Sequence, residues 1–246
     1  MKNRAGIFIT GTDTGVGKTL ICGAIARALF RKSIDCGIMK PIESGCRRGN
    51  RALLPSDGQY LQKAAKVQDP LDLITPCRFQ APLSPYAAML QGENDSLSWP
   101  KMEKAYKQLR RRHAALLLEG AGGLMVPVTA DKDMSDVIRF FKLPVLLVAR
   151  SGLGTLNHSL LSLAYGRARG LSFLGIVLNQ SGTKRDPSEV RNADILQERS
   201  SLPVMTFPPI KAGKDEEAII SESADRMAAH PIMDVVLRAI AQTNAG

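Results

Sequence analysis

A glycine-rich turn near the start of the chain has the residue types and spacing that bind a nucleoside triphosphate. The segment GIFITGTDTGVGKT passes from an apolar run into glycines and threonines and ends at Lys18 and Thr19. It nearly matches the Walker A pattern G-x-x-x-x-G-K-[ST], although the place of the first glycine falls at Thr12, one residue after Gly11. A strand, a glycine turn, Lys-Thr and an amphipathic helix follow in the order that a phosphate-binding loop requires. The alternative is an ordinary glycine-rich turn between a strand and a helix.

Phosphate binding by such a turn uses its backbone, its lysine and its threonine in different ways. Backbone N–H groups at the start of a helix point toward bound phosphate and carry partial positive charge. Lys18 is expected to reach the β- and γ-phosphates, and the Thr19 hydroxyl is expected to bind Mg²⁺. The residues expected to surround the phosphates are Gly15, Val16, Gly17, Lys18, Thr19 and Leu20.

Two carboxylates are candidates to complete a magnesium site, because Mg²⁺ needs more oxygen ligands than one hydroxyl supplies. Glu119 ends an apolar run in LLLEGAGG, where a Walker-B-like acid stands, and the glycines beside it let a ligand approach closely. Asp57 in LLPSDGQYL is the second candidate, although by itself it is more simply an N-cap of the following helix. Sequence spacing alone does not bring Asp57 to the metal.

Two further segments suit anions. Lys40, in KPIESG, ends an apolar run, and a lysine beside a triphosphate can stabilise a transferring phosphoryl group or an anionic acceptor. A surface lysine before a proline turn explains the same pattern equally well. Gly154, Thr155, Leu156 and Asn157 head an amphipathic stretch whose first N–H groups suit a carboxylate, although Thr155 or Asn157 is more simply a helix cap.

Six apolar runs alternate with helix-like stretches and predict the frame that holds these residues. Most runs are apolar throughout, as expected of strands buried on both faces. Their order predicts an α/β fold with a doubly wound, mostly parallel sheet flanked by helices, in a single domain over residues 1–246. The stretch 41–113 is long for one crossover, and the tail after about residue 215 is expected to be helical, broken near Pro231. The runs cover residues 6–10, 36–40, 114–119, 144–150, 173–179 and 203–207.

Composition narrows the class of protein. Of 246 residues, 44% are hydrophobic and 23% charged, close to globular averages, and the formal net charge is +10. The basic residues are spread along the chain, and the densest group, 110–113, is expected to be a solvated helix end, so we expect no nucleic-acid partner. No apolar run can cross a bilayer and no secretory signal is recognisable, so we expect a cytoplasmic protein without a membrane partner. The four cysteines form no C-x-x-C pair and are expected to be reduced thiols.

Five motifs, in their order and at these intervals, resemble the dethiobiotin synthetase family. They are TGTDTGVGKT, KPIESG, SDG, EGAGG and GLGTLNHSLL, and the resemblance runs from about Ile7 to Ile210. It implies a P-loop fold and an ATP- and Mg²⁺-dependent ligase that converts 7,8-diaminononanoate and CO₂ to dethiobiotin in biotin biosynthesis. It also implies a carbamate, a mixed carbamic–phosphoric anhydride, and a homodimer that holds the substrate carboxylate across its interface.

The resemblance assigns roles to residues that spacing alone leaves open. It implies that Lys18 and Lys40 are catalytic and that Thr19, Asp57 and Glu119 hold magnesium. The substrate residues that it implies are Thr14, Lys40, Ser44, Gly154, Thr155 and Asn157. The further nucleotide-binding residues that it implies are Gly120, Ala121, Gly122, Asn179, Gln180, Pro208, Pro209 and Ile210.

One rival interpretation is a partitioning or septum-site switch ATPase, which acts by dimerisation and partner binding. Such proteins carry a second, signature lysine early in the loop, where this chain has Asp13, and this absence argues against the rival. A cobyrinate amidase would need a glutaminase domain, for which the chain has no room. A non-enzymatic nucleotide-binding module is the last alternative.

Overall fold

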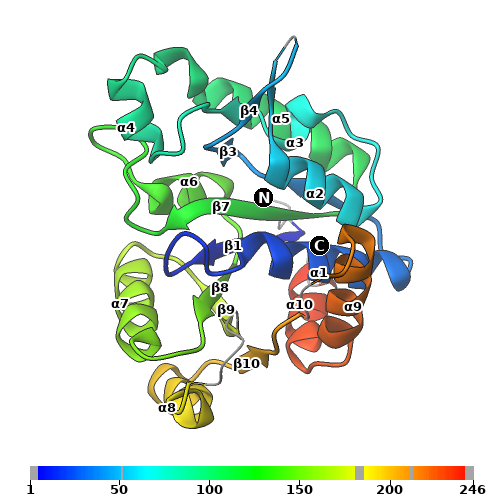
Figure 1. Ribbon diagram of the computed structural model, residues 1–246, viewed down its shortest axis with the longest axis vertical. Coiled ribbons are helices and arrows are strands. Elements are labelled where there is room, and N and C mark those ends of the chain that lie inside the picture. Colours follow the sequence, from blue (N-terminus) through cyan, green and yellow to red (C-terminus); the bar gives the residue numbers. More distant parts are fainter. Residues whose placement is uncertain (1–4, 51, 181–185, 211–212, 242–246) are drawn as a thin grey trace.

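A central six-stranded parallel sheet lies between two layers of helices (Figure 1). The computed structural model describes residues 5–50, 52–180, 186–210 and 213–241. The strands lie in the order β10-β9-β8-β1-β7-β2, so the strand that leads into the glycine turn is central. All six predicted strands are confirmed within one residue at each end, except that β7 continues to Gly123. They are β1 (Gly6–Gly11), β2 (Cys36–Met39), β7 (Ala115–Gly123), β8 (Val145–Arg150), β9 (Phe173–Asn179) and β10 (Val204–Phe207).

Alternate residues of each buried strand pack into different layers. Ile7 and Ile9 join the core on one face of the sheet, whereas Phe8 joins the core on the other. Leu117 packs on the first face, and its neighbours Leu116 and Leu118 on the second. Because both faces are covered, the strands are apolar throughout rather than alternating in polarity.

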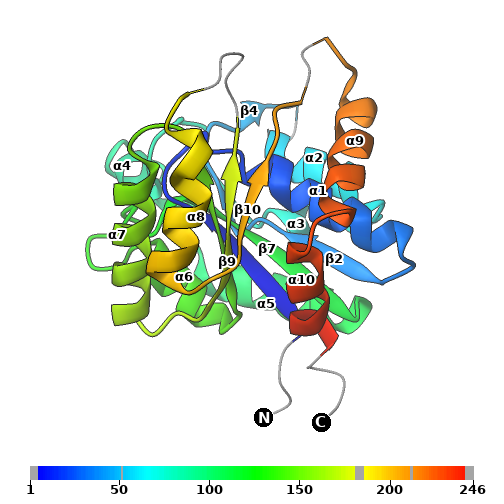
Figure 2. The ribbon, with the colours of Figure 1, turned by 90° about the horizontal axis from the view of Figure 1, so that it is seen from below.

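The first face is covered by α1 (Lys18–Arg31), α2 (Ser56–Ala65), α9 (Glu216–Ala228) and α10 (Ile232–Ala241). The second face is covered by α5 (Trp99–Arg112), α6 (Met134–Phe141), α7 (Thr155–Ala168) and α8 (Glu189–Ser200). Figure 2 shows the two helical layers on either side of the sheet. This is the doubly wound arrangement that the alternation of runs predicts.

The long stretch between β2 and β7 carries several short elements, as its length predicts. Two two-stranded sheets and two short α-helices lie above β7 in the view of Figure 1. The antiparallel pair β4 and β5 projects there as a hairpin. The short elements are β3 (Ile42–Glu43), β4 (Arg47–Arg48), β5 (Leu53–Leu54), α3 (Leu71–Ile74), β6 (Cys77–Arg78), α4 (Pro85–Leu90) and the 3₁₀ turn η1 (Asn94–Ser96).

The C-terminal tail is helical and is interrupted at Pro231, as predicted. Helix α9 packs along α1, the helix that follows the glycine turn. Buried Ala224, Met227, Met233 and Val236 bring α9 and α10 into the same core as Ile7 and Ile9. Removing these side chains from water stabilises the packing of the tail on the sheet.

The basic group at the end of α5 is not simply solvated, which corrects the expectation from the sequence. His113 lies between two carboxylates, with Nδ1 2.7 Å from Asp35 and Nε2 2.7 Å from Asp69. Arg112 also pairs with Asp69 at 2.9 Å, and Arg110 donates to the carbonyl of Ala5 at 2.7 Å. These contacts tie α5 to the amino ends of β1 and β2, opposite the glycine turn.

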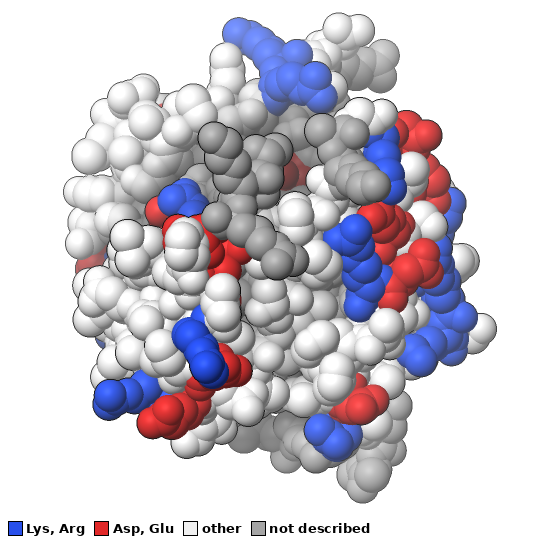
Figure 3. Space-filling view, turned by 60° about the horizontal axis from the view of Figure 1, so that its bottom comes forward, with Lys and Arg blue, Asp and Glu red and all other residues white. Residues whose placement is uncertain are grey.

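Charges of both signs lie side by side elsewhere on the surface. Figure 3 shows one face on which groups of Lys and Arg adjoin groups of Asp and Glu among the described residues. Within the described ranges, none of the helices has the length and apolar character that crossing a bilayer demands. The four cysteines are all buried and unpaired, in agreement with the prediction of reduced thiols.

Candidate nucleotide and phosphoryl-transfer site

The glycine turn wraps back over the end of β1 before α1 begins. Gly17 is the N-cap of α1 and has a φ of 96°, in the left-handed region that favours glycine. A Cβ atom on Gly17 would lie 2.1 Å from Nδ2 of Asn179, so no other residue fits there without moving Asn179. Asn179 in turn donates from Nδ2 to the carbonyl of Val16 at 3.0 Å. The end of β9 therefore supports the turn directly.

Lys18 and Thr19 begin α1 and point to different partners. The Lys18 ammonium donates to the carbonyl of Asp13 at 2.8 Å, within the turn. Burial disfavours its charge and the neighbouring Lys40 adds repulsion, so the pKa of Lys18 falls to about 8 although Glu119 partly opposes the shift. The Thr19 hydroxyl donates to Oε1 of Glu119 at 2.8 Å, which joins α1 to β7.

Lys40 bridges the two carboxylates that the sequence offers as metal ligands. Its ammonium lies 2.6 Å from Oδ2 of Asp57 and 2.7 Å from Oε1 of Glu119. The Lys40 side chain is 5% exposed and that of Glu119 is 1% exposed, whereas Asp57 is 42% exposed. Burial by itself would lower the pKa of Lys40, but the two carboxylates outweigh burial and raise it. The surface-lysine interpretation of Lys40 is therefore wrong.

These groups line one cavity of about 700 Å³ at the carboxyl ends of β1, β2 and β7. Two buried oxygens in it, Oγ of Ser44 and Oε2 of Glu119, have no hydrogen-bond partner among the described residues. Buried polar atoms are nearly always paired, so both are available to a ligand. The site residues expected from the sequence that line this cavity are Thr14, Gly15, Gly17, Lys18, Thr19, Lys40, Ser44, Asp57, Glu119, Ala121 and Gly122.

The oxygens in the cavity suit Mg²⁺. Thr19 supplies a hydroxyl, and Glu119 supplies a carboxylate with one oxygen that has no partner among the described residues. The carboxylate of Asp57 is paired with Lys40, which also contacts Glu119. Mg²⁺ prefers hydroxyl and carboxylate oxygens of this kind. Within the described residues, no three His, Cys, Asp or Glu side chains gather into a group that would hold a metal alone. A magnesium ion here would thus need oxygens from its nucleotide as well.

Glu43 positions Asp57, and sequence reasoning missed it. Its carboxylate accepts the backbone N–H of Asp57 and that of Gly58, both at 3.0 Å, and the Ser56 hydroxyl at 3.4 Å. The N-cap residue of α2 is Pro55, which makes no side-chain cap, so the alternative that Asp57 is the cap is wrong. The only signal in the sequence was the position of this carboxylate directly after Lys-Pro-Ile. Its partners at the start of α2 become apparent only in the fold.

The helix start expected to hold a carboxylate lies beside the cavity, not in it. Gly154 is the N-cap of α7 with a φ of 92°, and no side chain of the described residues caps the helix. The cap interpretation of Thr155 and Asn157 is therefore wrong, and Asn157 is exposed. Asp186 holds the preceding loop by accepting the N–H of Leu153 at 2.9 Å.

A second hollow of about 450 Å³ separates α7 from the glycine turn. Thr12 and Asp13 line one side, and His158 and Leu161 of α7 line the other. Large apolar side chains are exposed around it: Met125 is 67% exposed and Leu161 is 61% exposed.

The residues expected to contact the base gather on the other flank of the turn. Gln180 follows Asn179, and its N–H donates to the carbonyl of Phe207, the last residue of β10, at 2.9 Å. Its side chain donates to Glu189 at 2.9 Å. Pro208 and Pro209 are exposed directly after β10, so they lie next to the strand end that carries Asn179.

In this site a central parallel strand leads into a glycine turn, which is followed by a buried lysine and by a threonine in the first turn of a helix. This arrangement defines the P-loop class of nucleotide-binding proteins. The family model described as "AAA domain" matches residues 5–215. Among solved structures, the ParA family ATPase from Chlorobium tepidum TLS superposes with a TM-score of 0.52 at 13% identity over 98% of this chain and 99% of its own. A chain of the MinC:MinD cell division protein complex of Aquifex aeolicus gives a TM-score of 0.55 at 13% identity over 96% of each chain. At this identity the likeness shows the fold alone.

Curated relatives identify the family more narrowly. ATP-dependent dethiobiotin synthetase BioD of Thermodesulfovibrio yellowstonii is 40% identical over 84% of this chain and 89% of its own. The enzyme of the same name from Aquifex aeolicus is 39% identical over 83% and 89%, and that from Bacillus subtilis subsp. natto is 33% identical over 90% and 94%. The chain belongs to the family of ATP-dependent dethiobiotin synthetases.

Proposed function

We propose that this chain is a dethiobiotin synthase of biotin biosynthesis, which uses ATP and Mg²⁺ to close the urea ring of 7,8-diaminononanoate with CO₂. One observation carries the proposal beyond family membership: the glycine turn, Lys18, Lys40 and the Thr19–Glu119 pair all line one cavity. Two anions, a nucleotide phosphate and a carbamate, must meet there. Fixed positive charge between them lowers the cost of that approach.

The proposed reaction has three steps. One amine of the substrate adds to CO₂ and loses a proton, which gives a carbamate. A carbamate oxygen then attacks the γ-phosphorus of ATP, ADP leaves, and a carbamic–phosphoric anhydride forms. The second amine attacks the carbamoyl carbon, loses a proton and expels phosphate, which closes the ring.

The chain's own residues would act mainly by position and charge. Lys18 faces the turn and would neutralise the β- and γ-phosphates, while Lys40 would neutralise the charge shared by phosphoryl group and carbamate. Thr14 and Ser44, whose hydroxyl has no partner in the described part of the chain, would hydrogen-bond the carbamate. Magnesium held by Thr19, Asp57 and Glu119 would supply further positive charge at the phosphates.

The segment at the start of α7 supports the proposed binding of the substrate carboxylate and the proposed homodimer. Its N–H groups head a helix of 14 residues, which suits an anion, and Gly154 and Asn157 are exposed. Leu153 beside them is 88% exposed, and Met125 and Leu161 extend the apolar surface. Contact with a second copy would bury these side chains, and the proposed shared site requires that each helix start face the other copy's cavity.

A coupled assay tests the proposal. Phosphate release and dethiobiotin are measured with ATP, with and without diaminononanoate and bicarbonate. Phosphate release that requires both, in a one-to-one ratio with dethiobiotin, is expected. Slow ATP hydrolysis that ignores both substrates would instead indicate a switch ATPase, and the absence of any turnover would indicate a non-enzymatic module.

Subunit mixing tests the shared site. Lys40→Ala and Asn157→Asp variants are expected to be impaired separately, because one loses the reacting centre and the other repels the carboxylate. Coexpression would restore some activity if each site draws on two copies. Activity no greater than that of either variant alone would refute the dimer-spanning site. The absence of a nucleic-acid or membrane partner and a cytoplasmic location belong to the same proposal.

A further inference from the structure

An arginine of the C-terminal helix α9 holds the segment that follows β10. Nη1 of Arg226 donates to the carbonyls of Pro208 and Pro209, each at 3.0 Å. The two prolines are exposed, whereas Ile210 packs against the core beneath them. We call residues 208–210 the base segment. Arg226 holds it at the two prolines, and packing against the core holds it at Ile210.

The base segment needs such a partner because of its composition. Proline has no backbone N–H, so neither Pro208 nor Pro209 can donate to a neighbouring strand. The ladder between β9 and β10 ends at Phe207, whose carbonyl accepts from Gln180. Beyond that point the peptide planes of the two prolines are oriented by the guanidinium of Arg226.

Arg226 is itself fixed in direction. Its Nη2 pairs with Glu222 one turn earlier on α9, and Glu222 also pairs with Lys214. A guanidinium is planar, so an arginine held on one edge presents its other edge in a set direction. The guanidinium of Arg226 therefore fixes the base segment relative to α9.

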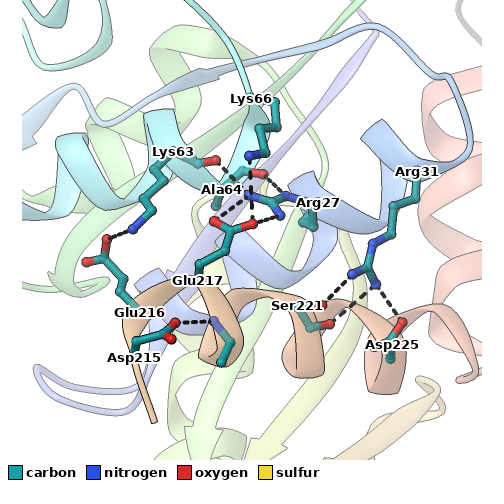
Figure 4. A network of polar contacts seen from close by, with 11 residues as sticks. Arg27, Arg31, Lys63, Ala64, Lys66, Asp215, Glu216, Glu217, Ser221 and Asp225 are labelled. Carbon is teal, nitrogen blue, oxygen red and sulfur yellow. Dashed lines mark hydrogen bonds and ion pairs between the residues drawn. The ribbon is translucent and has the colours of Figure 1, made fainter.

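Helix α9 is anchored on the helix that begins with Lys18 and Thr19. Figure 4 shows Arg27 of α1, which is 4% exposed, between Glu217 of α9 and the carbonyls of Lys63 and Ala64 of α2. Figure 4 also shows Arg31 of α1, which donates to Asp225 at 2.5 Å and to Ser221 at 2.6 Å. These contacts fix α1, α2 and α9 relative to one another, and through Arg226 they fix the base segment relative to α1 and the phosphate turn.

We propose that Arg226 is the positioning residue for the nucleotide base: it fixes the Pro208–Pro209 surface at a set distance from the phosphate turn. The inference rests on the proposed function, in which residues 208–210 line the base. A base is then bound by a surface formed before the nucleotide arrives, and the entropy of ordering that segment is not lost on binding. The triphosphate, held by α1 and the glycine turn, does not depend on Arg226.

Binding of two probes to the full chain separates base from phosphate. Mg²⁺-ATP and Mg²⁺-tripolyphosphate, which lacks a base, are titrated calorimetrically into the wild type, Arg226→Ala and Arg31→Ala. Arg31 is the matched control, because it also joins α9, at Ser221 and Asp225, and does not touch the base segment. Arg226→Ala is expected to weaken ATP binding about fivefold, the effect of one net hydrogen bond, with tripolyphosphate binding unchanged.

The other results have defined meanings. Equal losses for ATP and tripolyphosphate, or the same loss in Arg31→Ala, would show a general loosening of α9 and overturn the proposal. Unchanged ATP affinity in Arg226→Ala would also overturn it. Should Arg226→Ala not fold, Arg226→Lys keeps the charge beside Glu222 but lacks the fork, and a higher KM for ATP at constant kcat is expected from it. A wild type that makes no dethiobiotin refutes the proposed function, whereas the two-probe comparison still reports on Arg226.

Discussion

Replacement of Lys40 by alanine should affect stability and catalysis to different extents, and both effects follow from its two contacts. The change removes the cation that lies 2.7 Å from Glu119 and 2.6 Å from Asp57. Glu119 is buried, and loss of one partner of a buried pair costs about 3–5 kcal/mol. Asp57 is 42% exposed, so its contact adds at most about 1 kcal/mol after screening. We expect the free energy of unfolding to fall by about 3–6 kcal/mol at pH 7.

The charge on Glu119 causes most of that loss, and a double-mutant cycle measures it. In Lys40→Ala/Glu119→Gln the buried carboxylate is gone, so the double variant should be about 1–3 kcal/mol more stable than the sum of the single changes predicts. Denaturant unfolding of the four proteins, without nucleotide or magnesium, provides the values. Strict additivity would refute the conclusion that Lys40 serves as the counter-charge of Glu119.

The Lys40→Ala change should lower kcat by more than it weakens nucleotide binding. Removal of one charged group that stabilises a developing anion costs about 2.7–4 kcal/mol, or about 10²–10³ in kcat. The P-loop remains in Lys40→Ala, so the KM for ATP should change by less than about threefold. Steady-state phosphate release with diaminononanoate and bicarbonate measures both constants. Wild-type kcat in a folded Lys40→Ala protein would remove Lys40 from the reacting centre.

Three further predictions concern the metal, the turn lysine and His113 at the amino ends of the strands. Glu119→Gln should need about tenfold more Mg²⁺ for half-maximal ATP binding, because one charged oxygen ligand is lost; an unchanged Mg²⁺ titration would exclude Glu119 from the metal site. Since the pKa of Lys18 is about 8 and its ammonium is the form that binds phosphate, kcat/KM for ATP should decline as pH rises above about 8; a flat profile to pH 9.5 would contradict that role. Burial opposes the charge of His113, but Asp35 and Asp69 outweigh burial and raise its pKa, so its contribution to stability is complete below the ordinary histidine pKa and disappears as pH rises through the raised value. His113→Ala should therefore lower the free energy of unfolding by about 1–3 kcal/mol at pH 6 and by less at pH 9, and an equal loss at both pH values would count against this ion pair.

Sequence patterns predicted those parts of the molecule that local chemistry determines. The six strands are confirmed because continuous apolar runs have few alternatives in a chain of this length. The glycine turn is confirmed because Gly17 needs a left-handed backbone and Lys18 starts the next helix. Motif spacing also indicated the family, which the curated relatives confirm.

Capping and charge pairing were predicted less well, because both depend on partners far away in the chain. Asp57 stands before a helix pattern in a way typical of a helix cap, yet Glu43 supplies the contacts from another element. His113 ends a basic helix in a way typical of a solvated terminus, yet it lies between two carboxylates. In each case the sequence predicted the helix correctly but did not indicate which distant residue contacts the polar residue at its end.

The amino-acid sequence by itself determined the alternation of strands and helices, the phosphate turn and the set of charged residues that follow the strands. These are consequences of hydrophobic period and of backbone freedom at single residues, which act over a few positions. Only the tertiary structure decided that Lys40 joins Asp57 and Glu119, that Glu43 directs α2, and that Arg226 supports Pro208 and Pro209. Such contacts join residues from 13 to 79 positions apart, and the strand order that brings them together is a property of the whole packed chain.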